Sequence, residues 1–254
     1  MAESGLFLKA IHLIKREFMR NINHSAFFWV LVVLMICAVP SGTCVAWSND
    51  PAVNTAISMA FDHQYNHQIV PDGSGGAIIT WEDYRARYGT MADIYVQRVD
   101  WKSKVLWTLD GVAVSIAPND QLKPKMVSDG SGGAVIVWED SRNGNLDIYA
   151  QRIDSNGNLL WQSDGVAICT TAQPQEWPQI TSDGAGGAIM TWSDGRNGKS
   201  VIYGQRVDAD GQVWVADGVA VSEPSSGHYP QIASDGAGGA VISWTYGVYD
   251  GIRA

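Results

Sequence analysis

The chain has 254 residues, of which 46% are hydrophobic and 17% are charged, and this much apolar material excludes a largely disordered chain. Residues 1–46 hold 4 of the 17 basic and 2 of the 26 acidic residues. The remainder therefore carries 13 basic and 24 acidic residues, a net charge of −11, and such a surface repels nucleic acid and anionic membranes.

Residues 1–46 have the order of a secretory signal: four basic residues precede the uncharged run Ala26–Val39, and small residues follow it. The run has 14 residues, fewer than the roughly 20 that a membrane-spanning helix needs. We expect an N-terminal signal helix that is cleaved after Ala46, with Met19 as an alternative start to Met1. The protein is then secreted or displayed at the cell surface, and it contacts a membrane only through this segment, if the segment stays uncleaved.

One sequence element occurs four times after this segment. Its copies are PDGSGGAIITW (71–81), SDGSGGAVIVW (128–138), SDGAGGAIMTW (182–192) and SDGAGGAVISW (234–244). The tryptophans that end the copies are 57, 54 and 52 residues apart. So regular a period indicates a repeat architecture, and a tryptophan repeated in all four units is best explained by packing between units.

Each unit reads as four short strands separated by turns. In the third unit we expect strands at 178–182, 187–193, 201–207 and 213–222, because β-branched and aromatic residues fill these stretches and glycine-rich turns separate them. Four antiparallel strands in about 50 residues are typical of a β-propeller blade, so the predicted fold is all-β.

The predicted repeat domain is 47–254. We expect a lone last strand at 47–58, blade 1 at 59–115, blade 2 at 116–170, blade 3 at 171–223 and an incomplete blade 4 at 224–254. Either the N-terminal strand closes a ring of four blades, or the chain is part of a larger propeller.

The consensus PQI-SDG-GGAI--W-D-R-G--DIY-QR-D--G--LW--DGVA resembles the repeat of exported bacterial β-propeller-type proteins, which are mostly uncharacterised. The resemblance covers Trp47 to Ala254. It implies a propeller of four-stranded sheets and no agreed catalytic activity.

Three recurring polar patterns have structural explanations. The glycine loop leads into a strand and not into a helix N-terminus, so we interpret it as a turn and not as a phosphate cradle. The mid-strand arginines Arg98, Arg152 and Arg206 each require a carboxylate in the same or the adjacent blade. The loops DSNGN (154–158) and DADGQ (208–212) are best read as hairpin turns, although calcium binding remains a hypothesis, and no other cofactor is expected.

The sequence contains no recognisable arrangement of catalytic residues. No histidine has metal-ligand spacing, no serine lies in a nucleophile elbow, and Cys169 lies in an apolar strand where a buried, unreactive thiol is expected. We therefore expect a non-catalytic binding or scaffold module whose partner is a protein or a glycan. The alternative is a carbohydrate-binding lectin or a glycosidase-accessory propeller.

Candidate binding residues come from loops. The first unit has an irregular loop after Trp81, and two aromatic and two basic residues in it suit sugar stacking or a protein contact. An Asp-x-Arg motif follows the tryptophan in three units; it either grips a ligand or forms an ion pair that orients the loop. The predicted site residues are Tyr84, Arg85, Arg87, Tyr88, Arg142 and Arg196. The stretches 61–68 and 174–179, with their aromatics and histidines, are the next candidates.

Overall fold

The computed structural model describes residues 54–86, 91–196, 198–223, 227–246 and 252–253, which form four antiparallel sheets. We call the sheets blades. Blade 1 contains β1 (Gln64–Pro71), β2 (Ala77–Asp83), β3 (Asp93–Val99) and β4 (Val112–Ser115). Blade 2 contains β5 (Gln121–Ser128), β6 (Ala134–Asp140), β7 (Asp147–Ile153) and β8 (Val166–Cys169). Blade 3 contains β9 (Gln175–Ser182), β10 (Ala188–Asp194), β11 (Val201–Val207) and β12 (Val219–Ala220). Blade 4 contains β13 (Gly227–Ser234), β14 (Ala240–Tyr246) and β15 (Ile252–Arg253).

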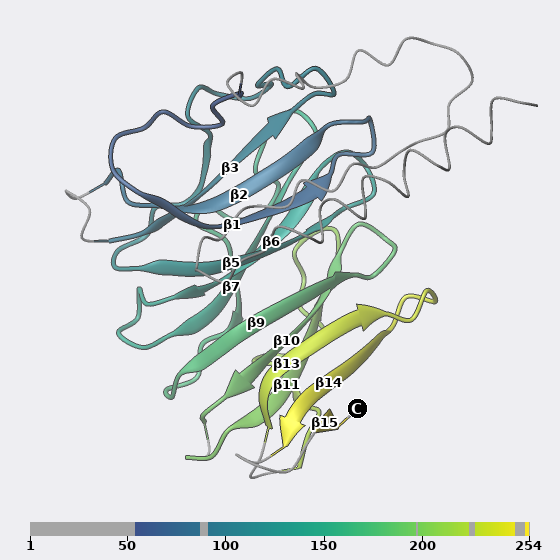
Figure 1. Cartoon of the computed structure of the whole chain (residues 1–254). Coiled ribbons are helices and arrows are strands. Elements are labelled where there is room, and N and C mark those ends of the chain that lie inside the picture. The colour runs from purple at the N-terminus through teal and green to yellow at the C-terminus, as the bar shows by residue number, and fades with distance from the viewer. Residues whose placement is uncertain (1–53, 87–90, 197, 224–226, 247–251, 254) are drawn as a thin grey trace, which may run out of the picture. The chain divides into compact units, whose positions relative to one another are not determined.

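The all-β prediction is confirmed for this part of the chain. The sheets follow one another in chain order without closing into a ring (Figure 1), and the first strands β1, β5, β9 and β13 contact one another in succession. The predicted signal segment lies outside the described residues, and within them no helix is long and apolar enough to cross a bilayer.

The blades are joined by apolar side chains of the second and third strands. All seven residues of β6 are buried, because neighbouring blades cover both of its faces. Trp138 of blade 2 is fully buried in one cluster with Ile78 and Ile94 of blade 1, and Trp192 of blade 3 lies in a second cluster with Val135 of blade 2. The prediction that the repeated tryptophan packs between units is confirmed for Trp138 and Trp192.

The outer strand is shorter than predicted. Instead of one strand over 213–222, Val213 forms an isolated bridge with Val207, and β12 contains only Val219 and Ala220. Between them the backbone turns at Asp217 and Gly218, whose φ angles are +57° and +74°. A Cβ at Gly218 would lie 2.6 Å from Cη2 of Trp192, so the turn brings backbone against the buried indole and interrupts the strand.

The first strand is longer than predicted. In blade 3, β9 starts at Gln175 and not at residue 178, because a bulge at Trp177 and Pro178 lets pairing continue beyond the proline. Proline has no N–H for the ladder and is tolerated in a strand at such a bulge. Each of the other first strands has the same irregularity.

A second set of contacts joins blades 1, 2 and 3 to the chain that precedes each of them. Asp164 Oδ1 accepts the amide of Ile116 at 2.9 Å, and the Ser115 hydroxyl lies 3.3 Å from Arg142 Nη2. At blade 1, Asp110 accepts the amide of Met59 at 2.7 Å, and Arg85 Nη2 lies 3.4 Å from the Ser58 hydroxyl. Residues 58 and 59 therefore make the contacts at blade 1 that the end of blade 1 makes at blade 2.

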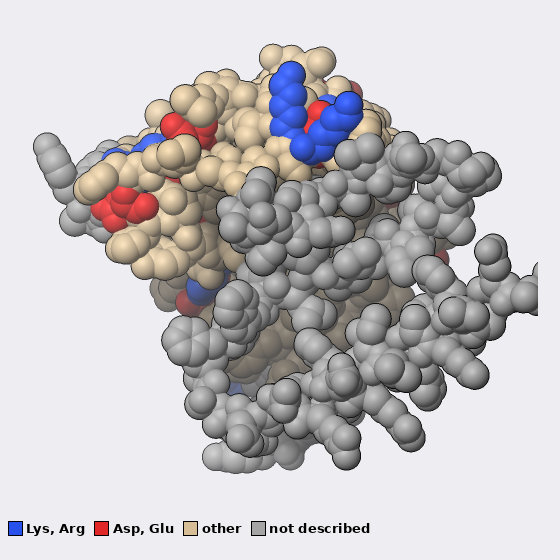
Figure 2. Space-filling model, turned by 45° about the horizontal axis from the view of Figure 1, so that its top comes forward, with Lys and Arg blue, Asp and Glu red and all other residues tan. Residues whose placement is uncertain are grey.

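On the face that Figure 2 shows, the described Lys and Arg side chains lie in small separate groups, several of them near acidic side chains. Most of the described surface in this view is uncharged, as expected for a chain with 17% charged residues.

Candidate functional site

Three of the four predicted arginines, Arg85, Arg142 and Arg196, lie in loops where each contacts several groups of its own blade. Arg85 forms a two-pronged ion pair with Asp83, with Nε 2.7 Å from Oδ1 and Nη2 2.6 Å from Oδ2, and Nη2 also donates to the carbonyl of Asp110 at 2.6 Å. Its guanidinium lies 3.9 Å from the ring centroid of Tyr95. Arg142 and Arg196 make the equivalent contacts with Asp140 and Asp194. Ligand binding by these arginines stays a prediction, and the predicted Arg87 and Tyr88 lie outside the described residues.

The glycine loops are turns, as predicted. Asp72 Oδ1 accepts the amides of Ser74 and Gly76, each at 2.8 Å, and Oδ2 pairs with Arg98 at 2.8 Å. Burial raises the pKa of Asp72, but these hydrogen bonds and the arginine charge outweigh it, so the pKa lies below its ordinary value. The carboxylate of Asp72, within the loop itself, thus accepts hydrogen bonds from the backbone amides that a phosphate would need. The predicted partners of the mid-strand arginines are also confirmed, since Arg152 pairs with Asp129 and Arg206 with Asp183.

The carboxylates of the two candidate calcium loops bind backbone amides. Asp154 Oδ1 accepts the amides of Asn156 and Asn158, and Asp208 Oδ1 accepts those of Asp210 and Gln212. Among the described residues no group of three or more His, Cys, Asp or Glu is placed to hold a metal ion. Calcium binding stays an untested hypothesis.

Cys169 is buried, as predicted, and burial is the largest cause that raises the pKa of its thiol to about 12. Its Sγ lies 3.2 Å from Arg196 Nη2, in the place that the hydroxyl of Ser115 occupies beside Arg142. The thiol is therefore a structural contact of the Asp-x-Arg loop and not a nucleophile.

Four residues on the first strands form a different cluster, which we call the inner-strand array: Asn66, Lys123, Trp177 and Tyr229. Each lies 15 residues before the repeated tryptophan of its unit, at the bulge of its strand. All four have left-handed backbones, with φ between +50° and +60°. The backbone is thus repeated from blade to blade, whereas the side chain differs in every blade.

Buried glutamates hold this backbone in place. Glu82 Oε1 in β2 accepts the amide of Lys123 at 2.5 Å, and Glu139 Oε1 in β6 accepts the amide of Trp177 at 2.7 Å. Each glutamate therefore fixes the left-handed residue of the next blade. Burial raises the pKa of Glu139, the Trp177 amide and Lys123 lower it, and the net shift is upward.

Side chains of the array contact one another in a row. Lys123 Nζ lies 3.1 Å from Glu139 Oε1 and 3.8 Å from the ring centroid of Trp177. The Tyr229 ring meets that of Trp177 edge to face, with centroids 5.3 Å apart. Trp177 is 40% exposed and Tyr229 is 57% exposed, so both rings are open to solvent.

A hollow of about 260 Å³ lies beside this row. Its lining residues come from β1, β5 and β9: Asn66, Gln68, Lys123, Pro124, Lys125, Trp177, Pro178 and Gln179. They offer an indole, three amides and two ammonium groups, and none of these described lining residues is a carboxylate. Such a wall can pack against an apolar ring face, donate to and accept from hydroxyl groups, and attract a negative charge.

Of the predicted site residues, Tyr84 is linked to this array through Glu82. A side-chain hydrogen bond with Glu82 is among the causes that raise the pKa of Tyr84, after burial and nearby negative charge. Glu82 in turn accepts from Asn66 Nδ2 at 2.7 Å. The candidate stretches 61–68 and 174–179 supply Asn66 and Trp177, whereas Lys123 was not anticipated. Its signal was available, because aligning the units places a different side chain at this position in each.

Comparisons with known proteins concern structure alone, since no family model and no curated protein matches the chain. An endo-arabinase from Bacteroides thetaiotaomicron is 18% identical over 73% of this chain and 71% of its own, with a TM-score of 0.37. An endo-1,4-beta-xylanase from the same organism is 7% identical over 74% and 67%, with a TM-score of 0.38. A structure from the GH130 family of mannoside phosphorylases is 10% identical over 71% and 59%, with a TM-score of 0.39.

The names of these similar structures correct one prediction made from the sequence. The prediction of a non-catalytic binding or scaffold module that is no enzyme is contradicted, because the similar structures are carbohydrate-active enzymes by name. Likenesses this remote carry no argument about substrate, and the function is argued below from the side chains of this chain.

Proposed function

We propose that the protein is carbohydrate-active and holds a sugar in the hollow of the inner-strand array. The observation that carries the proposal is Trp177, whose indole is 40% exposed at the wall of a polar hollow and whose backbone amide donates to Glu139. A sugar has apolar ring faces that pack on an aromatic ring and hydroxyl groups that need both donors and acceptors. The lining amides of Asn66, Gln68 and Gln179 provide both.

The charge of the wall favours a sugar that carries a carboxylate. Lys123 and Lys125 both line the hollow; Lys123 pairs with the buried carboxylate of Glu139, and among the described residues Lys125 forms no ion pair. The charged groups that line the hollow are these two ammonium groups, whereas the carboxylates of Glu82 and Glu139 are buried, and an ammonium group at the wall attracts an anionic ligand. A uronic acid supplies such a charge on a ring of the same size.

The proposal also covers the fold and the cellular location of the protein. We propose that the four sheets are blades of a propeller, because their first strands follow one another and bring the array together. Export through residues 1–46 would present the site to extracellular glycans, in keeping with the basic, apolar and small-residue order of that segment.

Titration of neutral and uronic-acid-containing oligosaccharides into the protein, followed by calorimetry, tests the proposal. Trp177→Ala should weaken binding by about tenfold or more, as removal of a central aromatic contact does. Trp214→Ala is the matched control, because it removes another exposed indole that does not line the hollow, and its affinity should equal that of the wild type. Both variants should melt at temperatures close to that of the wild type.

Analysis of the recovered sugar then separates two activities. Intact oligosaccharide identifies a binding protein, and shortened chains with new reducing ends identify a glycosidase. Absence of binding to the whole panel, or equal affinity of the wild type and the Trp177→Ala variant, would refute the site.

A further inference from the structure

A cluster of three aromatic side chains lies beside the array in blade 1. The rings of His63 and Tyr65 are stacked, with centroids 5.2 Å apart and 23° between their planes. The ring of Tyr84 meets that of Tyr65 edge to face, with centroids 5.7 Å apart. Tyr65 is 50% exposed, and it directly precedes Asn66 of the array in β1. An open aromatic surface therefore adjoins the hollow of the array.

Blades 2 and 3 have the same backbone contacts at these positions without the rings. In each blade, the residue before the array pairs with the second strand, and the carbonyl two residues before it accepts an amide from the loop that follows the second strand. These contacts match the cluster with Asp120, Leu122 and Ser141 in blade 2 and with Pro174, Glu176 and Gly195 in blade 3. The fold of a blade therefore does not require aromatic rings here.

One buried carboxylate joins the cluster to the hollow. The side chain of Tyr84 is hydrogen-bonded to Glu82. Glu82 Oε1 also accepts from Asn66 Nδ2 at 2.7 Å and from the amide of Lys123 at 2.5 Å. Asn66 and Lys123 both line the hollow. The aromatic cluster and the wall of the hollow are therefore held by the same glutamate.

Tyr65 lies on the side of blade 1 that blade 2 covers. It pairs with Glu82 in the ladder, and paired residues point to the same face of a sheet. Glu82 points to blade 2, because it binds the amide of Lys123 there. The ring of Tyr65 is thus open to solvent although a blade packs on this face, at the end of the sheet where β1 begins.

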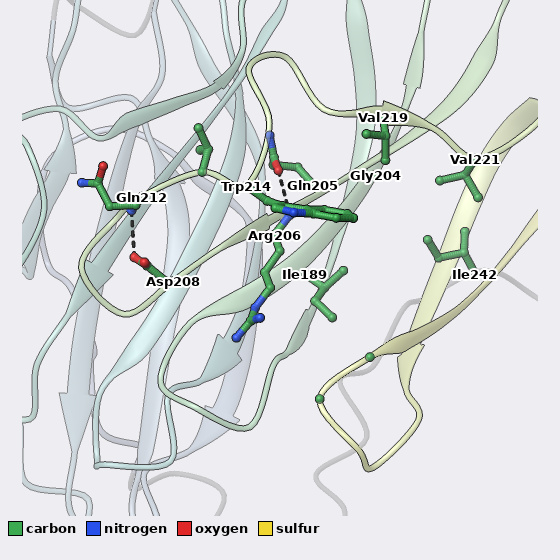
Figure 3. Close-up of a pocket in the computed structure, with 13 residues that line it drawn as sticks. Ile189, Gly204, Gln205, Arg206, Asp208, Gln212, Trp214, Val219, Val221 and Ile242 are labelled. Carbon is green, nitrogen blue, oxygen red and sulfur yellow. Dashed lines mark hydrogen bonds between the residues drawn. The ribbon is translucent and has the colours of Figure 1, made fainter.

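A larger hollow, of about 750 Å³, lies elsewhere and does not continue the site. Figure 3 shows Ile189, Val219, Val221 and Ile242 around it, so much of its wall is apolar. None of its described lining residues also lines the hollow of the array. A polar ligand that extends from the array is therefore matched by the cluster of blade 1 and not by this hollow.

We propose that the ring of Tyr65 is a second sugar-binding position and that the ligand is an oligosaccharide, which runs from Trp177 past Asn66 to Tyr65. The inference rests on the proposed function, because the hollow holds the first sugar residue. A second sugar residue packs an apolar face on the Tyr65 ring. The imidazole of His63, whose side chain is 69% exposed, exchanges hydrogen bonds with its hydroxyl groups.

The two positions differ in charge. Lys123 and Lys125 line the hollow, whereas Asp62 Oδ1 lies 3.7 Å from His63 Nε2, and the charges of Glu82 and Asp120 act on Tyr84. Negative groups around the cluster repel a second carboxylate. The ligand therefore carries its uronic acid in the hollow and a neutral sugar residue on Tyr65.

Calorimetric titration with glucuronic acid, and with oligosaccharides of two to six residues that carry one terminal glucuronic acid, tests the second position. Wild-type affinity should rise by about tenfold or more from the single acid to the longest chain. Tyr65→Leu places in blade 1 the residue that blade 2 has at this position, so its melting temperature should stay close to that of the wild type. It should abolish the gain with chain length and leave affinity for glucuronic acid unchanged, whereas Tyr65→Phe should retain the gain.

Trp101→Ala is the matched control, because this indole is 44% exposed and follows β3 at the other end of the same sheet. Its affinities should equal those of the wild type for every sugar. The inference is overturned if wild-type affinity does not depend on chain length, if Tyr65→Leu keeps the full gain, or if Tyr65→Leu weakens the single acid and the long chains equally. Trp177→Ala should weaken all of the sugars; if it does not, the proposed function is refuted, and if no sugar binds the wild type, both proposals are.

Discussion

Substitution of Gly165 by alanine tests whether the buried tryptophans determine where glycine is required in the turns between strands. Its φ is +88°, and a Cβ there would lie 2.5 Å from Cη2 of Trp138 and 2.8 Å from the carbonyl oxygen of Ala150. A left-handed backbone costs an L-residue about 1–2 kcal/mol. Forcing an extra methyl group into a packed interior costs about 1–3 kcal/mol more. Gly165→Ala should therefore lower the free energy of unfolding by about 2–5 kcal/mol.

Gly144 provides the matched control. Its φ is +95°, but nothing lies within 4 Å of the position of a Cβ, so Gly144→Ala bears only the backbone cost. At about 2–4 °C per kcal/mol for a domain of this size, Gly165→Ala should melt about 2–12 °C below Gly144→Ala in thermal denaturation followed by circular dichroism. Equal melting temperatures for the two variants would refute the argument that the indole sets this turn.

Three further predictions concern Cys169, Glu139 and Lys125. Cys169→Ser should change the melting temperature little, because Ser115 fills the equivalent place, and the native thiol should react slowly with a disulfide reagent at pH 8 because its pKa is about 12; fast labelling without unfolding would contradict this. The pKa of Glu139 is raised on folding, so its contribution to stability is present below its unfolded pKa and is lost as pH rises through the folded pKa. In urea titrations, Glu139→Gln should therefore reduce the change in the free energy of unfolding with pH over this range. An unchanged pH dependence would count against the shift. Lys125→Gln should weaken binding of uronic-acid-containing sugars and not that of neutral ones, with the difference shrinking at high salt; an equal loss for both classes would remove the charge argument.

The predictable part of the fold is the part that repeats. Glycines with positive φ, apolar second strands and the tryptophan recur with a step of about 52–57 residues, so turns, strands and packing between units could be read from the sequence. Strand ends were less predictable. The bulge at Trp177 extends β9 past a proline, and the contact of Gly218 with Trp192 cuts the outer strand to two residues, and both depend on tertiary neighbours.

The candidate site was harder to predict because its members do not resemble one another. The four residues of the array share a left-handed backbone conformation and a position 15 residues before the repeated tryptophan of their unit. The types of these residues, Asn66, Lys123, Trp177 and Tyr229, reveal neither property. The irregular stretches 61–68 and 174–179 include Asn66 and Trp177, but the sequence favours the loop at Tyr84 more strongly, because two aromatic and two basic residues lie close together there. Lys123 lies in a stretch without aromatics or histidines, and it reaches Trp177 because β5 packs beside β9 of the next blade.

The way in which the array is held explains how its side chains can differ. Glu82 and Glu139 bind the backbone amides of Lys123 and Trp177, so the restraint does not depend on which side chain follows. Glycine would adopt this left-handed conformation at little cost, whereas a side chain with a Cβ costs about 1–2 kcal/mol at each position. The chain nevertheless places lysine, tryptophan and tyrosine there, and all three lie in one row beside or facing solvent. The repeated bulge thus gives every blade the same left-handed position for a different side chain, and the exposed rings of Trp177 and Tyr229 come together there, which supports the array as the place where the ligand is held.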